Sequence, residues 1–171
     1  FRMKKYIIVL LILFLSSYFA SLIQSSWGQV RVESIKIPTQ NGQWVVADLF
    51  KPHKATSDNP APLVIIIPGF QRSKETLSNI AIELSRRGIV TITIDPYAQG
   101  MSSSSLSRRS ATKEGYGMFA LVDYVYDTAN LNYVDKSRIG VTGHSAGGLA
   151  AMRGAQYFGK IAIKNESKSK L

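Results

Sequence analysis

The most informative stretch of the sequence is Ile139-Gly140-Val141-Thr142-Gly143-His144-Ser145-Ala146-Gly147-Gly148. It begins as a short strand, predicted over 138–142, and continues into a helix rich in small residues, predicted over 146–158. The turn between them fits the pattern G-x-S-x-G, in which the serine takes a strained backbone conformation and the glycines leave room for the turn. We therefore expect Ser145 to present its hydroxyl at the carboxyl end of the strand. The residues expected to shape this turn, the elbow, are Gly143, His144 and Gly147.

A hairpin is predicted near the start of the body of the protein. Residues 30–37 alternate apolar and polar or charged side chains, which is typical of a half-exposed strand. Asn41-Gly42 favours a tight turn, because both residues tolerate positive φ, and residues 43–50 return as a second strand. Prolines and polar residues over 51–62 then predict a loop.

Beyond that loop, the pattern changes to buried strands that alternate with helices. Leu63-Val64-Ile65-Ile66-Ile67 is a continuous apolar run, as in a parallel strand covered on both faces. A helix is predicted from Ser73, its cap, to Gly88, followed by a strand over 88–94 and a second helix over 116–130. The buried face of this second helix is predicted to hold Met118, Leu121, Val122, Val125 and Ala129. The order of elements predicts an α/β sandwich with a mostly parallel sheet and an N-terminal antiparallel hairpin.

The composition favours a globular domain and excludes several kinds of site. Hydrophobic residues make up 45% of the chain and charged residues 19%. The 171 residues contain no cysteine, so they offer no disulfide, thiol nucleophile or cysteine-based zinc site. The formal net charge of +10 is concentrated at the two ends, and the middle has no basic stripe interleaved with aromatic side chains. Nucleic-acid binding is therefore not expected.

The N-terminal segment, residues 1–28, is predicted to be a signal peptide or an uncleaved membrane anchor. Tyr6–Ile23 is apolar and follows Lys4 and Lys5, which is the layout of an export signal. Its length is intermediate between a signal sequence and a short spanning helix, and Ser26-Trp27-Gly28 offers a small-x-small cleavage site, so both alternatives stay open. The lysines are expected to stay in the cytoplasm, which places the body outside, either membrane-anchored or secreted.

Residues 30–158 resemble the first half of the α/β-hydrolase fold, and they are similar to dienelactone-hydrolase-like and prolyl-oligopeptidase-like serine esterases. The stretches that carry the resemblance are Ile67-Pro68-Gly69-Phe70, Asp95–Ser102 and Gly143–Gly148. The resemblance implies that Ser145 is a nucleophile and that the backbone N–H groups of Phe70 and Ala146 form its oxyanion hole. It also implies hydrolysis of a small-molecule ester, or alternatively of a peptide or amide, through an acyl-enzyme on Ser145. No metal or organic cofactor is implied, and Asp95 is expected to be structural.

The part of the chain after Ser145 lacks the expected partners of the nucleophile. In the α/β-hydrolase fold the acid and the histidine follow the serine, but here no histidine follows it and Glu166 is the only acid. Ile161-Ala162-Ile163 is expected to be the remnant of the next strand. The sequence therefore predicts an incomplete hydrolase domain over 29–160, truncated after the elbow helix, with 161–171 as a polar tail produced by truncation.

Neither histidine of the chain is expected to serve as the base. His144 is expected to shape the elbow, and His53 to be a solvated residue in the loop after the hairpin. Arg72 is expected to be a solvated surface charge, with attraction of an acidic substrate group as the alternative. Because a serine without a base is a weak nucleophile, the second hypothesis is a non-catalytic, membrane-anchored scaffold that has lost its activity.

Overall fold

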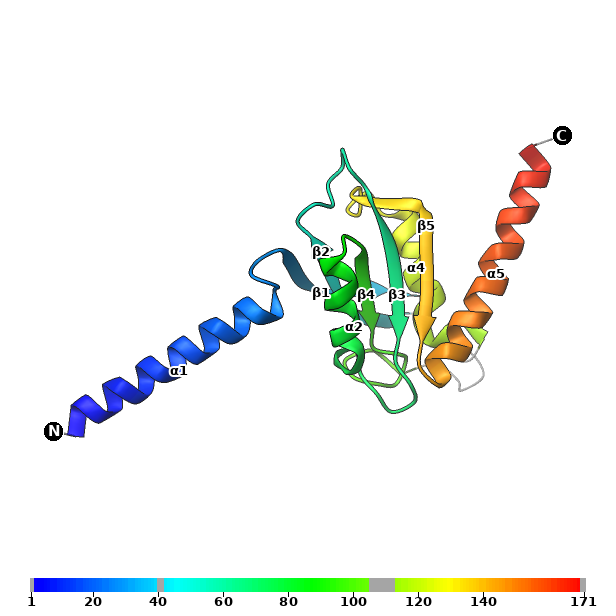
Figure 1. The fold of residues 1–171 in the computed structure, drawn as a ribbon. Helices are drawn as coiled ribbons and strands as arrows, with labels where there is room; N and C mark the ends of the chain where they lie inside the picture. Colours follow the sequence, from blue (N-terminus) through cyan, green and yellow to red (C-terminus); the bar gives the residue numbers. More distant parts are fainter. Residues whose placement is uncertain (1, 40–41, 105–112, 170–171) are drawn as a thin grey trace.

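The computed structural model describes residues 2–39, 42–104 and 113–169. A long N-terminal helix, α1 (Arg2–Gln24), projects from a body in which helices flank a five-stranded sheet (Figure 1). The last helix, α5 (Ala146–Ser169), starts at the sheet and extends past it. The hairpin turn predicted at Asn41-Gly42 lies partly outside the described residues, and Gly42 has the positive φ, 73°, that the turn requires.

The sheet is mixed and follows the order β1-β2-β4-β3-β5. Its strands are β1 (Val30–Pro38), β2 (Trp44–Pro52), β3 (Ala61–Ile67), β4 (Val90–Ile94) and β5 (Val134–Gly143). The hairpin strands β1 and β2 are antiparallel to each other, and β2 is antiparallel to β4. β3 lies between β4 and β5 and is parallel to both. The predicted α/β sandwich with an N-terminal antiparallel hairpin is therefore confirmed.

β3 is the strand around which both halves of the core are built. Successive side chains of a strand point to opposite faces, so Ile65 and Ile67 join one cluster and Ile66 joins the other. The larger cluster lies under α4 (Met118–Asp127), and the smaller one lies under α2 (Ser78–Arg86). Both faces of the strand are therefore covered, as its continuous apolar sequence predicts.

The helices that cover the sheet begin differently from the prediction. A 3-10 turn, η2 (Lys74–Leu77), precedes α2, and Ser73 makes no side-chain capping bond to it, so the predicted cap is wrong. A second 3-10 turn, η3 (Gly115–Gly117), precedes α4. α4 buries four of the five predicted side chains, but it ends at Asp127, so Ala129 lies beyond it and is exposed.

The backbone of residues 161–163 is helical, so the expected strand remnant at Ile161-Ala162-Ile163 is wrong. Residues 160–169 contain neither glycine nor proline, and their lysines, alanine and glutamate favour a helix. α5 therefore continues to Ser169 instead of turning back into the sheet.

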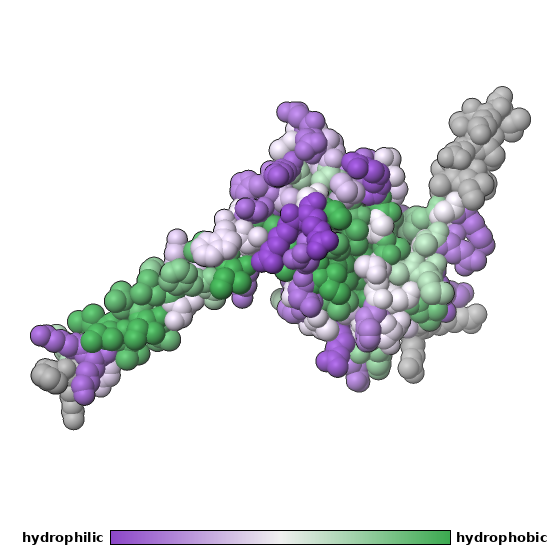
Figure 2. Space-filling view, in the orientation of Figure 1, coloured by the Kyte–Doolittle hydropathy of each residue, from purple (hydrophilic) through white to green (hydrophobic). Residues whose placement is uncertain are grey.

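No residue of α1 belongs to either buried cluster of the body. Within it, Met3–Gln24 forms a stretch of 22 residues with a mean hydropathy of 2.4 and none of it is buried. Figure 2 shows apolar side chains over this projecting helix. By length and composition alone, α1 is able to cross a membrane.

Candidate active site

Ser145 occupies a strained turn between β5 and α5. Its φ of 55° lies in the left-handed region, which is unfavourable for a residue with a Cβ. β5 ends at Gly143 and α5 begins at Ala146, so the turn joining them is as short as the sequence pattern predicts. Ser145 is exposed to solvent, and it lies at the end of α5 whose free backbone N–H groups favour a negative charge.

The glycines of the elbow allow it to pack directly onto the end of β3. A Cβ placed on Gly147 would lie 2.0 Å from the carbonyl oxygen of Ile67, and one placed on Gly143 would lie 2.6 Å from the same oxygen. The backbone N–H of His144 donates a hydrogen bond to that oxygen at 3.1 Å. Larger residues at these two positions would push the elbow away from the sheet.

The loop after β3 lies against the elbow. A Cβ placed on Gly69 would be 3.3 Å from the Cβ of Ser145 and 3.2 Å from Nδ1 of His144. Phe70 follows Gly69 in this loop, and its side chain is 59% exposed. The structure thus brings together the stretch that contains Ser145 and Ala146 and the stretch that contains Phe70, while the oxyanion-hole role of the two amides stays a prediction.

Asp95 holds the loops beside the elbow in place. The residue is buried, and its Oδ1 accepts a hydrogen bond from the Lys74 backbone N–H at 2.7 Å, while its Oδ2 accepts one from the Met101 N–H at 2.9 Å. Its backbone oxygen accepts a bond from the Ser102 hydroxyl at 2.6 Å. A Cβ on Gly100 would meet the Asp95 carboxylate at 2.2 Å, so the glycine lets the loop close around it. These contacts occupy both carboxylate oxygens with backbone amides.

The side chain of Lys74 was not singled out by the sequence, although it is buried beside this loop. Its ammonium lies 3.2 Å from the carboxylate of Asp48 and also pairs with Glu75. Burial lowers the pKa of Lys74, but the hydrogen bonds to Glu75 and Asp48 outweigh this effect and raise it above its ordinary value. The hydrogen bond from Lys74 lowers the pKa of Glu75 to about 2. A lysine in a predicted first helical turn gives no sign of burial, so only the tertiary structure reveals this pair.

The structure describes both histidines and Arg72, the other charged or titratable residues considered for the site. His144 is exposed and directly precedes Ser145 in the elbow. His53 lies after β2, in a cavity lined by Arg86 and Gly88 at the start of β4, which is the opposite end of the parallel strands. The Arg72 side chain is exposed, and its backbone N–H donates a bond to Oε1 of Gln99 at 2.7 Å. Among the described residues, no group of three His, Cys, Asp or Glu side chains is placed to hold a metal ion.

Comparison with known proteins identifies the family. Residues 18–165, which include the hairpin, β3 and the elbow, match the family described as PETase: PET hydrolase-like. The chain belongs to the PET hydrolase-like family. The matched region of this chain contains the turn with Ser145 and the loop after β3.

Individual relatives of this PET hydrolase-like chain are esterases or hydrolases by name. A bis(hydroxyethyl) terephthalate hydrolase from Streptomyces coelicolor is 28% identical over 103 residues, which cover 60% of this chain and 31% of that protein. The structure of Est1E from Butyrivibrio proteoclasticus with bound ferulic acid is 28% identical, with a TM-score of 0.62, and the match covers 74% of this chain and 49% of that one. The chain thus spans about a third to a half of the length of these proteins.

More distant structures share the fold. A dienelactone hydrolase-like promiscuous phosphotriesterase, P91, from metagenomic libraries is 14% identical with a TM-score of 0.59, and the match covers 75% of this chain and 55% of that one. The resemblance to α/β-hydrolases of the dienelactone-hydrolase-like type is therefore confirmed at the level of fold.

We expect Gly147→Ala to destabilise the protein strongly, by about 1–3 kcal/mol or more, because its Cβ would collide with the Ile67 carbonyl. The matched control is Gly159→Ala, also in α5, whose Cβ would have nothing within 4 Å. It should leave stability unchanged or raise it by up to about 1 kcal/mol. Urea unfolding of the full chain in detergent, followed by circular dichroism, measures both. Equal midpoints for the two variants would contradict the close packing of the elbow.

We expect Asp95→Ala to cost about 1–3 kcal/mol for each backbone amide left without a partner, and to speed hydrogen exchange at Lys74 and Met101. Asp58→Ala removes an exposed carboxylate whose contact to Ser57 is 3.4 Å, so it should change stability by less than about 0.5 kcal/mol. Urea unfolding and amide exchange by mass spectrometry test the pair. Unchanged exchange at both amides in Asp95→Ala would show that Asp95 does not hold these loops.

Proposed function

We propose that the protein hydrolyses carboxylic esters through an acyl-enzyme on Ser145. The observation that carries the proposal is the strained, exposed Ser145 at the start of α5, in a chain of the PET hydrolase-like family. Strain of this kind persists where the surrounding structure imposes it, and here the packing of the elbow on β3 does so. A serine that merely capped a helix would not need a left-handed conformation.

The proposed reaction follows from the groups around Ser145. Its Oγ attacks the carbonyl carbon of the ester and loses its proton to a base, and the carbonyl oxygen becomes an oxyanion. The N–H groups of Phe70 and Ala146 are proposed to donate hydrogen bonds to this oxyanion. The alcohol then leaves with the proton, and water hydrolyses the acyl-enzyme to release the acid and restore the serine hydroxyl.

We propose esters of aromatic carboxylic acids as the substrates. Two relatives point in this direction by name, one as a hydrolase of bis(hydroxyethyl) terephthalate and the other as a structure with bound ferulic acid. The edge of the sheet near the elbow offers exposed apolar side chains for contact with an aromatic acid, namely those of Phe70 and Met101, which are 59% and 70% exposed. An amide substrate is the alternative, with a poorer leaving group for the same chemistry.

Turnover requires a base, and neither histidine of the chain is placed to be one. His53 lies at the far end of the strands, and the backbone of His144 is part of the elbow itself. Neither of the two histidines is therefore proposed as the base. This observation also favours the second candidate, a scaffold that keeps the fold without catalysis.

We further propose that residues 1–28 direct the chain to or through a membrane, with the body, proposed as the hydrolase unit over 29–160, on the outer side. The support is the length and hydropathy of α1 and the position of Lys4 and Lys5 at its start. Export as a cleaved signal and retention as an anchor both fit these properties.

A fluorophosphonate probe tests the nucleophile. We expect slow labelling of the chain at Ser145, reduced by about 10³-fold or more relative to a complete serine hydrolase because no base activates the hydroxyl. Peptide mass spectrometry locates the label, Ser145→Ala should abolish it, and Ser57→Ala, at an exposed loop serine, should not. Labelling that survives Ser145→Ala would refute the assignment. Ester turnover at the rate of a complete hydrolase would instead show that a base is present.

A further inference from the structure

The end of α1 is folded into the body rather than linked to it by an extended segment. Three consecutive residues have positive φ, Ser26 at 51°, Trp27 at 59° and Gly28 at 77°, and together they make a compact turn. The Trp27 N–H donates to the Leu22 carbonyl at 2.6 Å, and the Val30 N–H donates to the Ser25 carbonyl at 3.0 Å. Ser26 is 7% exposed. The turn from α1 into β1 is therefore a defined structure, which we call the joint (residues 23–30).

A side chain of the body fastens this joint. Arg86, in the last turn of α2, donates from Nε to the Ser26 hydroxyl at 3.0 Å and from a terminal nitrogen to the Ile23 carbonyl at 3.5 Å. The C-terminal end of a helix carries a partial negative charge, so the guanidinium stabilises the end of α1, where the Ile23 carbonyl also accepts a hydrogen bond from the Ser26 N–H at 3.1 Å. The Gln29 carbonyl also accepts a bond from the backbone N–H of His53 at 2.9 Å. The joint is thus held from two sides.

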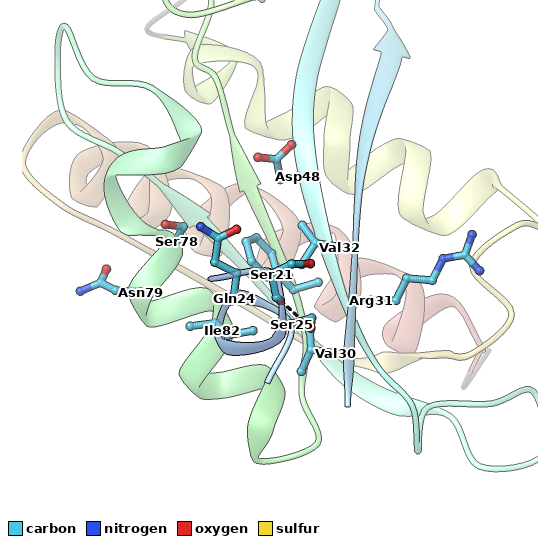
Figure 3. A pocket seen from close by; sticks show the side chains of 11 residues that line it. Ser21, Gln24, Ser25, Val30, Arg31, Val32, Asp48, Ser78, Asn79 and Ile82 are labelled. Carbon is cyan, nitrogen blue, oxygen red and sulfur yellow. Dashed lines mark hydrogen bonds between the residues drawn. The ribbon is translucent and has the colours of Figure 1, made fainter. Parts of the chain in front are cut away.

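A groove opens between the end of α1 and the body. It has a volume of about 660 Å³, and it is lined by the last turns of α1, by β1 and β2, and by α2 (Figure 3). Ile82 and Val30 give it apolar walls, while Ser21, Gln24 and Asn79 give it a polar rim. Arg31 and Asp48 also line it, so the groove combines apolar walls with polar side chains and one charge of each sign.

Cationic and aromatic side chains surround the same joint. Trp27 is 68% exposed, and tryptophan favours the headgroup level of a bilayer. A second cavity, of about 370 Å³, is lined by His53, Lys54, Arg86 and Arg87 together with polar or apolar residues, and no acidic residue lines it. Lysine and arginine near a membrane surface are attracted by anionic lipids.

The length of α1 places Trp27, the groove and the second cavity near the surface of a bilayer that α1 crosses. The apolar stretch Tyr6–Ile23 is about 27 Å long as a helix, close to the hydrocarbon thickness of about 30 Å. A bilayer crossed by this stretch therefore ends at the joint, where Trp27, the groove and the cationic cavity lie.

We propose that α1 stays attached as a membrane anchor, and that the joint seats this end of the body on anionic phospholipid headgroups. The inference rests on the proposed location of the chain at a membrane, and it selects retention over cleavage. Cleavage after Gly28 would remove Ser26 and Ile23, the two α1-side partners of Arg86.

The joint and the elbow lie at opposite ends of the strands of the sheet. The strand pairs at the joint end are Val30–Pro52 and Leu63–Val90, and the pair at the elbow end is Ile67–Gly143. β3 has 7 residues between these ends, which is about 20 Å. Ser145 therefore lies at the end of the strands opposite to the joint.

Tryptophan quenching tests the seating, because the chain holds only two tryptophans and they lie at opposite ends of the sheet. Trp44→Phe leaves Trp27 at the joint, and Trp27→Phe leaves Trp44, whose indole N–H binds the Met101 carbonyl beside the candidate catalytic edge. The full chain is reconstituted in phosphatidylcholine vesicles with about a third phosphatidylglycerol, carrying a headgroup spin label. We expect Trp27 to be quenched at least about twofold more than Trp44. Equal quenching of the two would overturn the seating.

Arg86 and Arg87 form a matched pair for testing the joint. Both arginines contact Glu83 within α2, but Arg86 also donates hydrogen bonds to Ser26 and Ile23 at the end of α1. Arg86→Ala should speed amide exchange at Trp27 and Val30 by about tenfold, and Arg87→Ala should leave it unchanged. Equal exchange in both variants would refute the fastening role of Arg86.

The intact mass of the membrane-bound protein completes the test. A mass that includes α1 supports retention, and an N-terminus at Gln29 overturns it. If the protein is released from membranes by alkaline carbonate with α1 still attached, the proposed membrane location fails. A membrane-bound protein whose Trp27 is not quenched by the headgroup label refutes only the seating. Fluorophosphonate labelling of Ser145 is independent of all these outcomes.

Discussion

The close approach of Gly147 to the carbonyl oxygen of Ile67 is the contact on which the candidate site depends. At this point α5 begins almost against the end of β3, and no side chain separates them. The contact fixes the start of α5 relative to the sheet, and it compels Ser145 to bridge strand and helix with a φ of 55°. A turn with side chains at positions 143 and 147 would sit farther out, and the loop that contains Phe70 would lose its contact with the elbow.

Asp95 supplies the second constraint at the same edge. The elbow packs closely on β3 because Gly143 and Gly147 have no side chain. The neighbouring loops are instead stabilised by the buried carboxylate of Asp95, which accepts hydrogen bonds from two backbone amides. Buried carboxylates are tolerated when their lone pairs are satisfied in this way. The strain at Ser145 is balanced by the packing of the elbow on β3 and by the anchoring of the loops nearby.

The sequence predicted those features that depend on local pattern. The hairpin, the doubly buried β3 and the elbow each follow from periodicity or from a short motif, and the structure contains all three. The predicted capping bond of Ser73 was wrong, because capping depends on the geometry of the first helical turn. The strand expected at 161–163 was also wrong, because a strand needs a neighbouring strand to pair with. Lys74 and Arg86 were missed, since their partners lie up to 63 residues away and no local pattern indicates such contacts.

The sheet separates the two activities proposed for this chain. The joint precedes β1 and the elbow follows β5, so they lie at opposite ends of the strands and at opposite edges of the sheet. Substitutions at such a distance usually act independently, so changes at Arg86 should alter the anchoring without altering the reactivity of Ser145. β3, which is buried on both faces, lies between the two sites, so occupation of the groove at the joint is not expected to change the elbow.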